Sequence, residues 1–484
     1  MILAIDIGTS SVRAALYDHK GALVKGTLVR NERRLRNTTD GGSEIDAEAA
    51  LRQTVQTIDE VLDISARIKG EITHVASCSF WHSLVGIDAN SKPTTKVLSW
   101  ADNRSRKQVA VLRKKLNESD VHDRTGARFH SSFWPAKMLW IRETQPEVFA
   151  RTAMWLSLSD YISIRLCDST TTSVSMASAT GIFDIRACQW DKPLTKFLKI
   201  RRVSLPTIAA DAETLQLNDK FAKRWPRLAD AKWFPAIGDG AANNVGSGCT
   251  TKKRLGLMVG TSGAMRVAYR GTPPKKLPSG LWCYRIDRER VVVGGALSDG
   301  GGLFEWLRNN LDLPKNFERE IASRIPDQHG LTFLPFLAGE RSTGYHENAR
   351  GAIIGLTSGT TSVDIAQAAM ESVGYRFAEI FDQIKGIAET SEIVASGGAL
   401  RASKVWTQMI ADILGKEITL VEVPEASLRG AVLLVLESIG NIESIEEISS
   451  ALGKRFVPNT NKNKAYKLSR REHQRLYDLF LNKD

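Results

Sequence analysis

An aspartate near the middle of the chain stands among unusually small residues. Asp239 lies within Pro235-Ala-Ile-Gly-Asp-Gly-Ala-Ala-Asn-Asn-Val-Gly-Ser-Gly248, a stretch that holds four glycines. Such a composition is typical of a constrained loop that enters a helix. A carboxylate held in this way could act as a general base and take a proton from a hydroxyl group. Because aspartate is also a common helix N-cap, the local pattern leaves both roles open.

The tripeptide Gly-Thr-Ser occurs twice, about half a chain apart. Gly8 begins the first copy after the apolar run Leu3-Ala-Ile-Asp-Ile7, and Gly260 begins the second after Leu255-Gly-Leu-Met-Val259. Glycine lets a backbone approach a ligand closely, and hydroxyls beside exposed backbone N–H groups suit phosphate oxygens. One such tripeptide is usually a hairpin turn, but two at this spacing favour a paired phosphate clamp. The hydroxyl residues of this clamp are Thr9, Ser10, Thr261 and Ser262.

The two copies differ at one chemically important position. Asp6 stands in the first strand where Met258 stands in the second. A carboxylate beside a phosphate-binding turn is unfavourable unless a cation lies between the two negative charges. We therefore predict that Asp6 holds a magnesium ion, directly or through water.

Strand and helix patterns alternate around these motifs. Apolar runs predict strands on both sides of each Gly-Thr-Ser turn and at 72–76, 84–87 and 393–395. Helical spacing of apolar residues predicts one helix after Asp46 and another from Ser403 to Leu414. This alternation predicts an α/β fold.

Two further segments directly follow predicted strands. Trp81 and His82 come after the strand at 72–76, and ligands of α/β sheets bind beyond strand ends, so these residues could meet a substrate. Gly397-Gly398 joins the strand at 393–395 to the next helix. Two glycines allow a nucleotide base or ribose to approach closely, although an ordinary strand-to-helix corner explains them equally well.

Length and composition limit the class of protein. A chain of 484 residues exceeds one domain, and its 42% hydrophobic and 25% charged residues exclude disordered, collagen-like and coiled-coil proteins. We expect a cytoplasmic protein without a membrane span or secretory signal, with five reduced cysteines. The net charge of +12 suits anionic small ligands. Because the basic clusters lack interleaved aromatics, we expect no nucleic-acid partner.

The most specific motif is Gly351-Ala-Ile-Ile-Gly-Leu356, followed after seven residues by Asp364-Ile-Ala-Gln-Ala-Ala-Met-Glu371. Through this motif, and along most of its length, the chain resembles the FGGY carbohydrate kinases, members of the actin-like ATPase superfamily. The resemblance implies two actin-like (ribonuclease H-like) α/β domains with a deep cleft between them. Residues 1–240 would form the sugar-binding domain, and residues 241–484 the ATP-binding domain.

The resemblance also implies roles for individual residues. Asp239 falls on the family's catalytic base, and Asp6-Ile-Gly-Thr-Ser-Ser11 is similar to the family's first phosphate loop, with Arg13 at its usual basic position. Gly397-Gly398 with Arg401 is similar to the family's adenosine turn. The residues implied to bind ATP are Thr9, Ser10, Arg13, Gly260, Thr261, Ser262, Gly302, Gly397, Gly398 and Arg401.

The sugar-side segments, among them Phe80-Trp-His-Ser83 and Leu98-Ser-Trp-Ala-Asp-Asn-Arg-Ser105, are most similar to the gluconokinase branch. The substrate residues implied are Trp81, His82, Trp100, Asp102, Arg104 and Asp239. Gluconate needs a cationic or amide partner for its carboxylate, and Arg104 is the candidate. Xylulose, another ketopentose or a polyol remains the alternative substrate, and a homodimer remains an open alternative. A non-catalytic sensor would lack the base, and the presence of both Asp6 and Asp239 argues against it.

Overall fold

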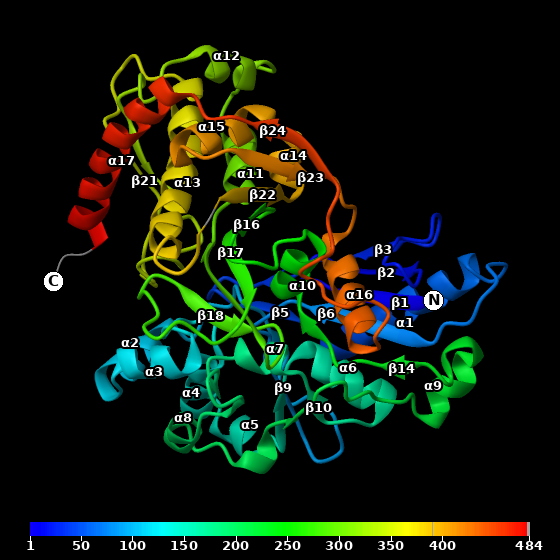
Figure 1. The fold of residues 1–484 in the computed structure, drawn as a ribbon. Coiled ribbons are helices and arrows are strands. Elements are labelled where there is room, and N and C mark those ends of the chain that lie inside the picture. Colours follow the sequence, from blue (N-terminus) through cyan, green and yellow to red (C-terminus); the bar gives the residue numbers. More distant parts are fainter. Residues whose placement is uncertain (390, 482–484) are drawn as a thin grey trace.

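Two central β-sheets organise the computed structural model, which describes residues 1–389 and 391–481 (Figure 1). The first sheet has the strand order β14-β6-β1-β2-β3, with β15 also paired to β6, and the second has the order β18-β19-β17-β16-β22-β23-β24. The strands of the first sheet are β1 (Ile2–Ile7), β2 (Ser11–Tyr17), β3 (Val29–Glu32), β6 (His74–Ser79), β14 (Lys232–Trp233) and β15 (Ile237–Gly238). Those of the second are β16 (Arg254–Val259), β17 (Gly263–Arg270), β18 (Trp282–Arg285), β19 (Arg290–Leu297), β22 (Glu392–Ser396), β23 (Ile418–Val421) and β24 (Leu452–Phe456).

The two sheets repeat one topology. In the first, β1 pairs antiparallel with β2 and parallel with β6. In the second, β16 pairs antiparallel with β17 and parallel with β22. Each Gly-Thr-Ser turn joins the two strands of the antiparallel hairpin. This repeated pairing confirms the predicted duplication and the α/β class.

The helices cover these sheets and carry the loops between strands. They are α1 (Ala47–Ile64), α2 (Arg106–Lys115), α3 (Glu118–Thr125), α4 (Trp134–Thr144), α5 (Pro146–Arg151), α6 (Leu158–Cys167), α7 (Val174–Ser178), α8 (Lys192–Phe197), α9 (Asp219–Arg224), α10 (Asp239–Gly246), α11 (Gly301–Asn310), α12 (Phe317–Ser323), α13 (Ser362–Ile384), α14 (Gly398–Ala402), α15 (Lys404–Leu414), α16 (Ala426–Ser438) and α17 (Thr460–Leu481), with 3₁₀ turns at Arg202–Ser204 and Pro226–Leu228. Short outer strands are β4 (Arg36–Asn37), β5 (Ser43–Ile45), β7 (Val85–Ile87), β8 (Val97–Leu98), β9 (Met154–Leu156), β10 (Thr171–Thr172), β11 (Phe183–Asp184), β12 (Gln189–Trp190), β13 (Thr207–Ile208), β20 (Thr332–Leu334) and β21 (Ala352–Ile354).

Local signals placed most element ends well. Asp46 caps α1 by accepting a hydrogen bond from the backbone N–H of Ala49 at 2.9 Å. Gly415 ends α15 in the left-handed conformation. The predicted strand at 72–76 is two to three residues too early, because Ile72 enters the core without pairing and the ladder with β1 begins at His74.

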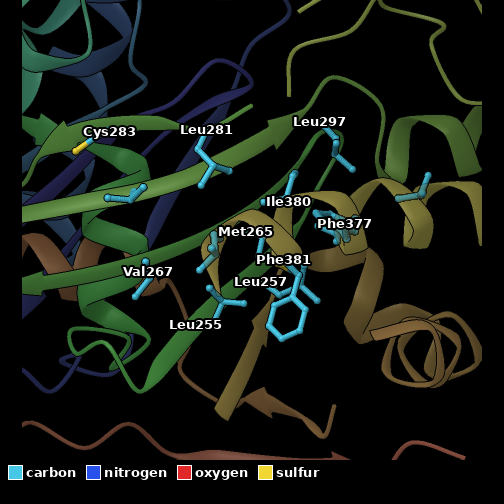
Figure 2. Packing of buried hydrophobic residues seen from close by; sticks show 14 of the residues in the cluster. Leu255, Leu257, Met265, Val267, Leu281, Cys283, Leu297, Phe377, Ile380 and Phe381 are labelled. Atoms are coloured by element: carbon cyan, nitrogen blue, oxygen red, sulfur yellow. The ribbon is translucent and has the colours of Figure 1, made fainter. Parts of the chain in front are cut away.

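Side chains of α13 pack on one face of the second sheet, as Figure 2 shows. Phe377, Ile380 and Phe381 of this helix meet Leu257 and Met265 of the sheet. The strands make room for the rings with glycine. A Cβ placed on Gly263 would lie 2.6 Å from the ring of Phe377, so glycine is required for this close packing.

The helix α16 belongs to the second half of the sequence but covers the first sheet, where it packs on β1, β2 and β6 (Figure 1). It also crosses α10 at very close range. A Cβ on Gly430 of α16 would lie 1.8 Å from the carbonyl oxygen of Ala242, and one on Gly246 of α10 would lie 1.8 Å from that of Ala426. Two glycines therefore allow these backbones to touch and tie the two halves together. The domain boundary at residue 240 stays a prediction.

Two further observations bear on the cysteines and on membrane spans. All five cysteines carry free thiols. Within residues 1–389 and 391–481, no helix is both long and apolar enough to cross a bilayer.

Candidate functional site

Asp239 is the first residue of α10 and does not cap it. Gly238 occupies the N-cap position, and no side-chain cap bond forms. Asp239 Oδ1 instead accepts a hydrogen bond from the backbone N–H of Gly240 at 2.7 Å. The N-cap alternative is therefore wrong. Because no other described residue donates to this carboxylate, its second oxygen stays available to a substrate hydroxyl.

The surroundings of Asp239 favour proton uptake near neutral pH. Burial raises its pKa to about 6, and the negative charge of Asp6 acts in the same direction. The guanidinium of Arg266 opposes this rise. A carboxylate that titrates near the working pH is well suited to general base catalysis.

Trp81 lies directly beneath the backbone that carries Asp239. A Cβ on Gly238 would be 1.8 Å from Trp81 Nε1, and a Cβ on Gly240 would be 2.4 Å from the ring. The indole N–H donates to the carbonyl oxygen of Ser175 at 3.2 Å. Trp81 was predicted to contact the sugar, but this geometry shows that it also supports both flanks of Asp239.

His82 is buried beside Trp81 in a strained conformation. Its φ of 68° is rare for a residue with a side chain and is typical of functional sites. His82 Nδ1 lies 2.6 Å from the carbonyl oxygen of Ala179, which places the proton on this nitrogen. Burial and the charge of Arg341 hold the pKa of His82 well below its usual value, so the ring is neutral. Its Nε2 is then a hydrogen-bond acceptor.

Beside the first Gly-Thr-Ser turn, the predicted residues Asp6 and Arg13 are joined by two charged residues, Arg33 and Glu425, that sequence patterns missed. Asp6 Oδ2 forms an ion pair with Arg13, which also binds Glu425 at 2.5 Å. The guanidinium of Arg33 donates to the carbonyl oxygens of Gly8 and, at 3.4 Å, of Thr9. Glu425 precedes α16, some 400 positions from this turn, so no local signal could have identified it.

Asp6 meets the chemical requirement for holding a cation. Its Oδ1 is buried and has no hydrogen-bond partner among the described residues. Burial raises the pKa of Asp6, against the lowering effect of Arg13. The charges of Asp6 and Asp239 also repel one another. A hydrated Mg²⁺ would satisfy the free oxygen and reduce this repulsion, so the residues present fit the ion.

The second Gly-Thr-Ser turn packs against two other predicted glycine positions. The backbone N–H of Gly302 donates to the carbonyl oxygen of Thr261 at 2.9 Å. A Cβ on Gly397, whose φ is 100°, would lie 2.3 Å from the carbonyl oxygen of Val259. Gly260, Gly302 and Gly397 therefore come together at the carboxyl ends of the central strands β16 and β22, and their role toward a nucleotide stays a prediction.

The side chains of Arg401 and Asp299, which lie near these strand ends, form hydrogen bonds with the backbone of neighbouring loops. The guanidinium of Arg401 donates to the carbonyl oxygens of Val421 and Val423, both at 3.0 Å. Asp299 Oδ2 accepts a hydrogen bond from the backbone N–H of Ala338 at 3.1 Å. Both side chains thus fix neighbouring loops, and the role of Arg401 toward ATP stays a prediction.

The predicted Trp100, Asp102 and Arg104 group separates into two environments. Asp102 is buried and accepts hydrogen bonds from the backbone N–H of Ser43 at 3.0 Å and from Arg104 at 2.6 Å. Arg104 also pairs with Glu44 at 3.1 Å. Because two protein carboxylates already neutralise Arg104, the structure does not support it as the partner of a substrate carboxylate. Trp100 instead lies under the guanidinium of Arg341, at 5.4 Å.

A variant of Arg266 should change the pH dependence of the reaction. The guanidinium of Arg266 donates to the carbonyl oxygen of Gly240 at 3.4 Å and lowers the pKa of Asp239. In Arg266→Met, Asp239 loses this stabilisation of its charged form, so the acidic limb of the kcat/KM profile should shift to higher pH. Arg266→Lys is the control that keeps the charge, and its limb should stay close to that of the wild type. If the acidic limb of Arg266→Met is unchanged, the group that titrates there is not Asp239 under the influence of Arg266.

Comparison with known proteins places the whole chain in one group. Residues 1–246 match the N-terminal domain of the FGGY family of carbohydrate kinases, and residues 256–436 match its C-terminal domain. A gluconokinase of Bacillus subtilis (strain 168) is 27% identical over 505 residues, covering 99% of this chain and 95% of the relative. The crystal structure of gluconate kinase from Lactobacillus acidophilus has a TM-score of 0.89 at 26% identity, with 99% of this chain and 98% of that chain covered. Ligand-bound xylulose kinase from the same organism has a TM-score of 0.90 at 27% identity, with the same coverage.

Proposed function

The chain belongs to the FGGY family of carbohydrate kinases, phosphotransferases with an alcohol group as acceptor, and from this premise we propose that it phosphorylates gluconate with ATP. The acceptor is the terminal hydroxyl of the sugar acid. Similarity to gluconokinases along almost the full chain supports this choice. Xylulose kinases, which match at 25% identity in Staphylococcus epidermidis and at 27% in Lactobacillus acidophilus, keep a ketopentose as the second candidate.

Asp239 carries the proposed chemistry. Its carboxylate takes the proton of the hydroxyl while the hydroxyl oxygen forms a bond to the γ-phosphorus of ATP. The bond between that phosphorus and the bridging oxygen breaks, and ADP leaves with the electron pair. The single observation that supports this role most strongly is the half-buried carboxylate at the start of α10, whose pKa is raised to about 6.

The remaining residues bind and orient the reactants. Backbone N–H groups of the turns at Gly8 and Gly260 stabilise negative charge on the phosphoryl oxygens. Asp6, with its unpartnered Oδ1, is the residue that would hold Mg²⁺. When bound, this ion neutralises charge on the phosphates. Neutral His82 accepts a hydrogen bond from a sugar hydroxyl.

Gly398→Ala tests the proposed adenosine turn without disturbing the fold. A Cβ on Gly398 would have nothing within 4 Å, so we expect an unchanged melting temperature. If the base or ribose contacts this position, the methyl group should raise the KM for ATP by about tenfold, corresponding to about 1.4 kcal/mol. Gly359→Ala, at an exposed site with no close neighbour, is the matched control. An unchanged KM would remove the turn from the nucleotide site.

The substrate proposal is tested by measuring ADP release with gluconate, other sugar acids, ketopentoses, polyols and glycerol. Gluconate should give the highest kcat/KM, and ADP release without acceptor sets the background. A higher kcat/KM for xylulose would favour the second candidate. A rate with gluconate no greater than background would reject the first.

A further inference from the structure

Arg341 presents a cation that has no anionic partner in the protein. Among residues 1–389 and 391–481, no side chain forms an ion pair with its guanidinium, and the guanidinium donates no hydrogen bond; its contact is with the ring of Trp100. Burial lowers the pKa of Arg341, yet the residue is only half-buried and so stays open to a ligand. Charges removed from water are normally paired, so an external anion would complete the site.

Tyr284 supplies a second unpartnered group at the same place. Its buried hydroxyl has no hydrogen-bond partner among the described residues, which is uncommon. The Tyr284 ring lies edge-on to Trp81 at 5.1 Å and to His82 at 5.6 Å, close to the predicted sugar residues. The ring of Phe133 lies 6.5 Å from that of Tyr284, and the neighbouring Ser132 donates to the carbonyl oxygen of Trp100 at 2.7 Å, so Tyr284 and the contact between Arg341 and Trp100 lie in the same part of the molecule.

The other nearby cations, among them Arg266, which donates to the carbonyl oxygen of Gly240, each have at least one hydrogen-bond partner in the protein. Lys137 is buried, and its ammonium donates to the carbonyl oxygen of Ser132. Burial lowers the pKa of Lys137 to about 7 and also lowers the pKa of His130. Arg104 pairs with Asp102 and Glu44. Of these cations, Arg341 is the one whose side chain donates no hydrogen bond to any described residue, and it lies beside Trp100.

The protein holds Arg341 firmly from the second half of the chain. The preceding residue, Glu340, is buried and binds Arg376 at 2.5 Å and the hydroxyl of Tyr477 at 2.8 Å. The following residue, Ser342, exchanges hydrogen bonds with the backbone of Ala296 on β19, both at 3.0 Å. These contacts fix the backbone on both sides of Arg341, so the loop that carries the guanidinium needs little rearrangement when a ligand binds.

We propose that Arg341, assisted by the hydroxyl of Tyr284, binds the carboxylate of the sugar-acid substrate and sets the preference for an anionic acceptor. This inference rests on the proposed function. The ring of Trp81 lies 5.1 Å from that of Tyr284 and also lies beneath the two glycines that flank Asp239, which places the base close to the same group of residues. A linear sugar acid carries its carboxylate and its terminal hydroxyl at opposite ends. One end then meets Arg341 while the other meets Asp239. Guanidinium groups suit carboxylates because two parallel N–H groups can bind both oxygens.

The test compares gluconate with sorbitol, which has the same carbon chain but no carboxylate. Calorimetric dissociation constants and kcat/KM would be measured for both in the wild type, Arg341→Gln, Arg341→Lys and Tyr284→Phe. Removing a charged hydrogen-bond partner costs about 1.5–3 kcal/mol. Arg341→Gln should therefore weaken gluconate binding by about 10- to 100-fold. The ratio of the gluconate constant to the sorbitol constant should change by most of that factor.

The other variants separate charge from structure. Arg341→Lys should keep part of the preference, because a lysine retains the charge but not the paired donors. Tyr284→Phe should weaken gluconate binding by a smaller factor with the fold intact. Arg350→Gln, in the same loop but exposed, is the matched control and should leave the ratio unchanged. Melting temperatures and ATP binding establish that each variant is folded.

Two outcomes would overturn the inference in different ways. If Arg341→Gln weakens gluconate and sorbitol equally, Arg341 supports the fold and does not select the anion, while the proposed function stands. If the wild type binds no sugar acid but phosphorylates xylulose, the proposed function fails and the inference fails with it. A selective loss of gluconate binding would support both.

Discussion

Asp239→Asn is expected to lower kcat by about a thousandfold, within the range that general base catalysis contributes. The amide has nearly the shape of the carboxylate but cannot accept the hydroxyl proton. ATP binding should be retained, because the predicted nucleotide turns at Gly260 and Gly397 lie on the second sheet. ADP release and equilibrium ATP binding, measured side by side, would check this result.

The pH dependence gives the same prediction a second readout. The pKa of Asp239 is about 6, so the carboxylate is ionised and active above this pH and protonated below it. The wild-type kcat/KM should fall as the pH decreases through 6, by about tenfold per unit at lower pH. The residual activity of Asp239→Asn should lack this limb. Asp230→Asn, at an exposed site, is the matched control. Near-normal turnover of Asp239→Asn would exclude Asp239 as the base.

Gly430→Val is expected to destabilise the protein by about 3 kcal/mol or more, because overpacking at a backbone contact forces helices apart. A Cβ on Gly430 would lie 1.8 Å from the carbonyl oxygen of Ala242. The shift would move α10, which carries Asp239, and should therefore lower kcat as well as the melting temperature. Gly430→Ala should show the same effects to a lesser degree.

Thermal unfolding and turnover of the two Gly430 variants would be compared with those of Gly359→Ala. Gly359 is exposed and its Cβ would have no close contact, so this variant should behave as the wild type. A Gly430→Val protein that melts and turns over like the wild type would show that α10 and α16 do not cross as described.

Local patterns were sufficient for several features of this protein. The repeated Gly-Thr-Ser turns identified the duplicated hairpins, because glycine and adjacent apolar runs specify such turns within a few residues. Asp46 and Gly415 marked helix ends by bonds to their own neighbours. Asp239 stood out through the small residues around it. The structure adds that two of its glycines are required because Trp81 fills the space beneath them.

Pairing across long distances in the chain was beyond any local pattern. Arg13 could be predicted as a basic residue beside a phosphate turn, but not its simultaneous bonds to Asp6 and Glu425. Arg104 was a reasonable partner for a substrate carboxylate until Glu44 and Asp102 were found to neutralise it.

The sequence by itself determined the α/β class, the duplication, and the base Asp239 as a candidate, since each depends on residues close together in the chain. Only the tertiary structure decided which cations are neutralised and which remain free. Arg341 and Trp100 lie more than 200 positions apart, yet the guanidinium rests 5.4 Å from the ring. The physical reason is that the energy of a charge depends on its burial and on its partners in space, and the folded chain sets both.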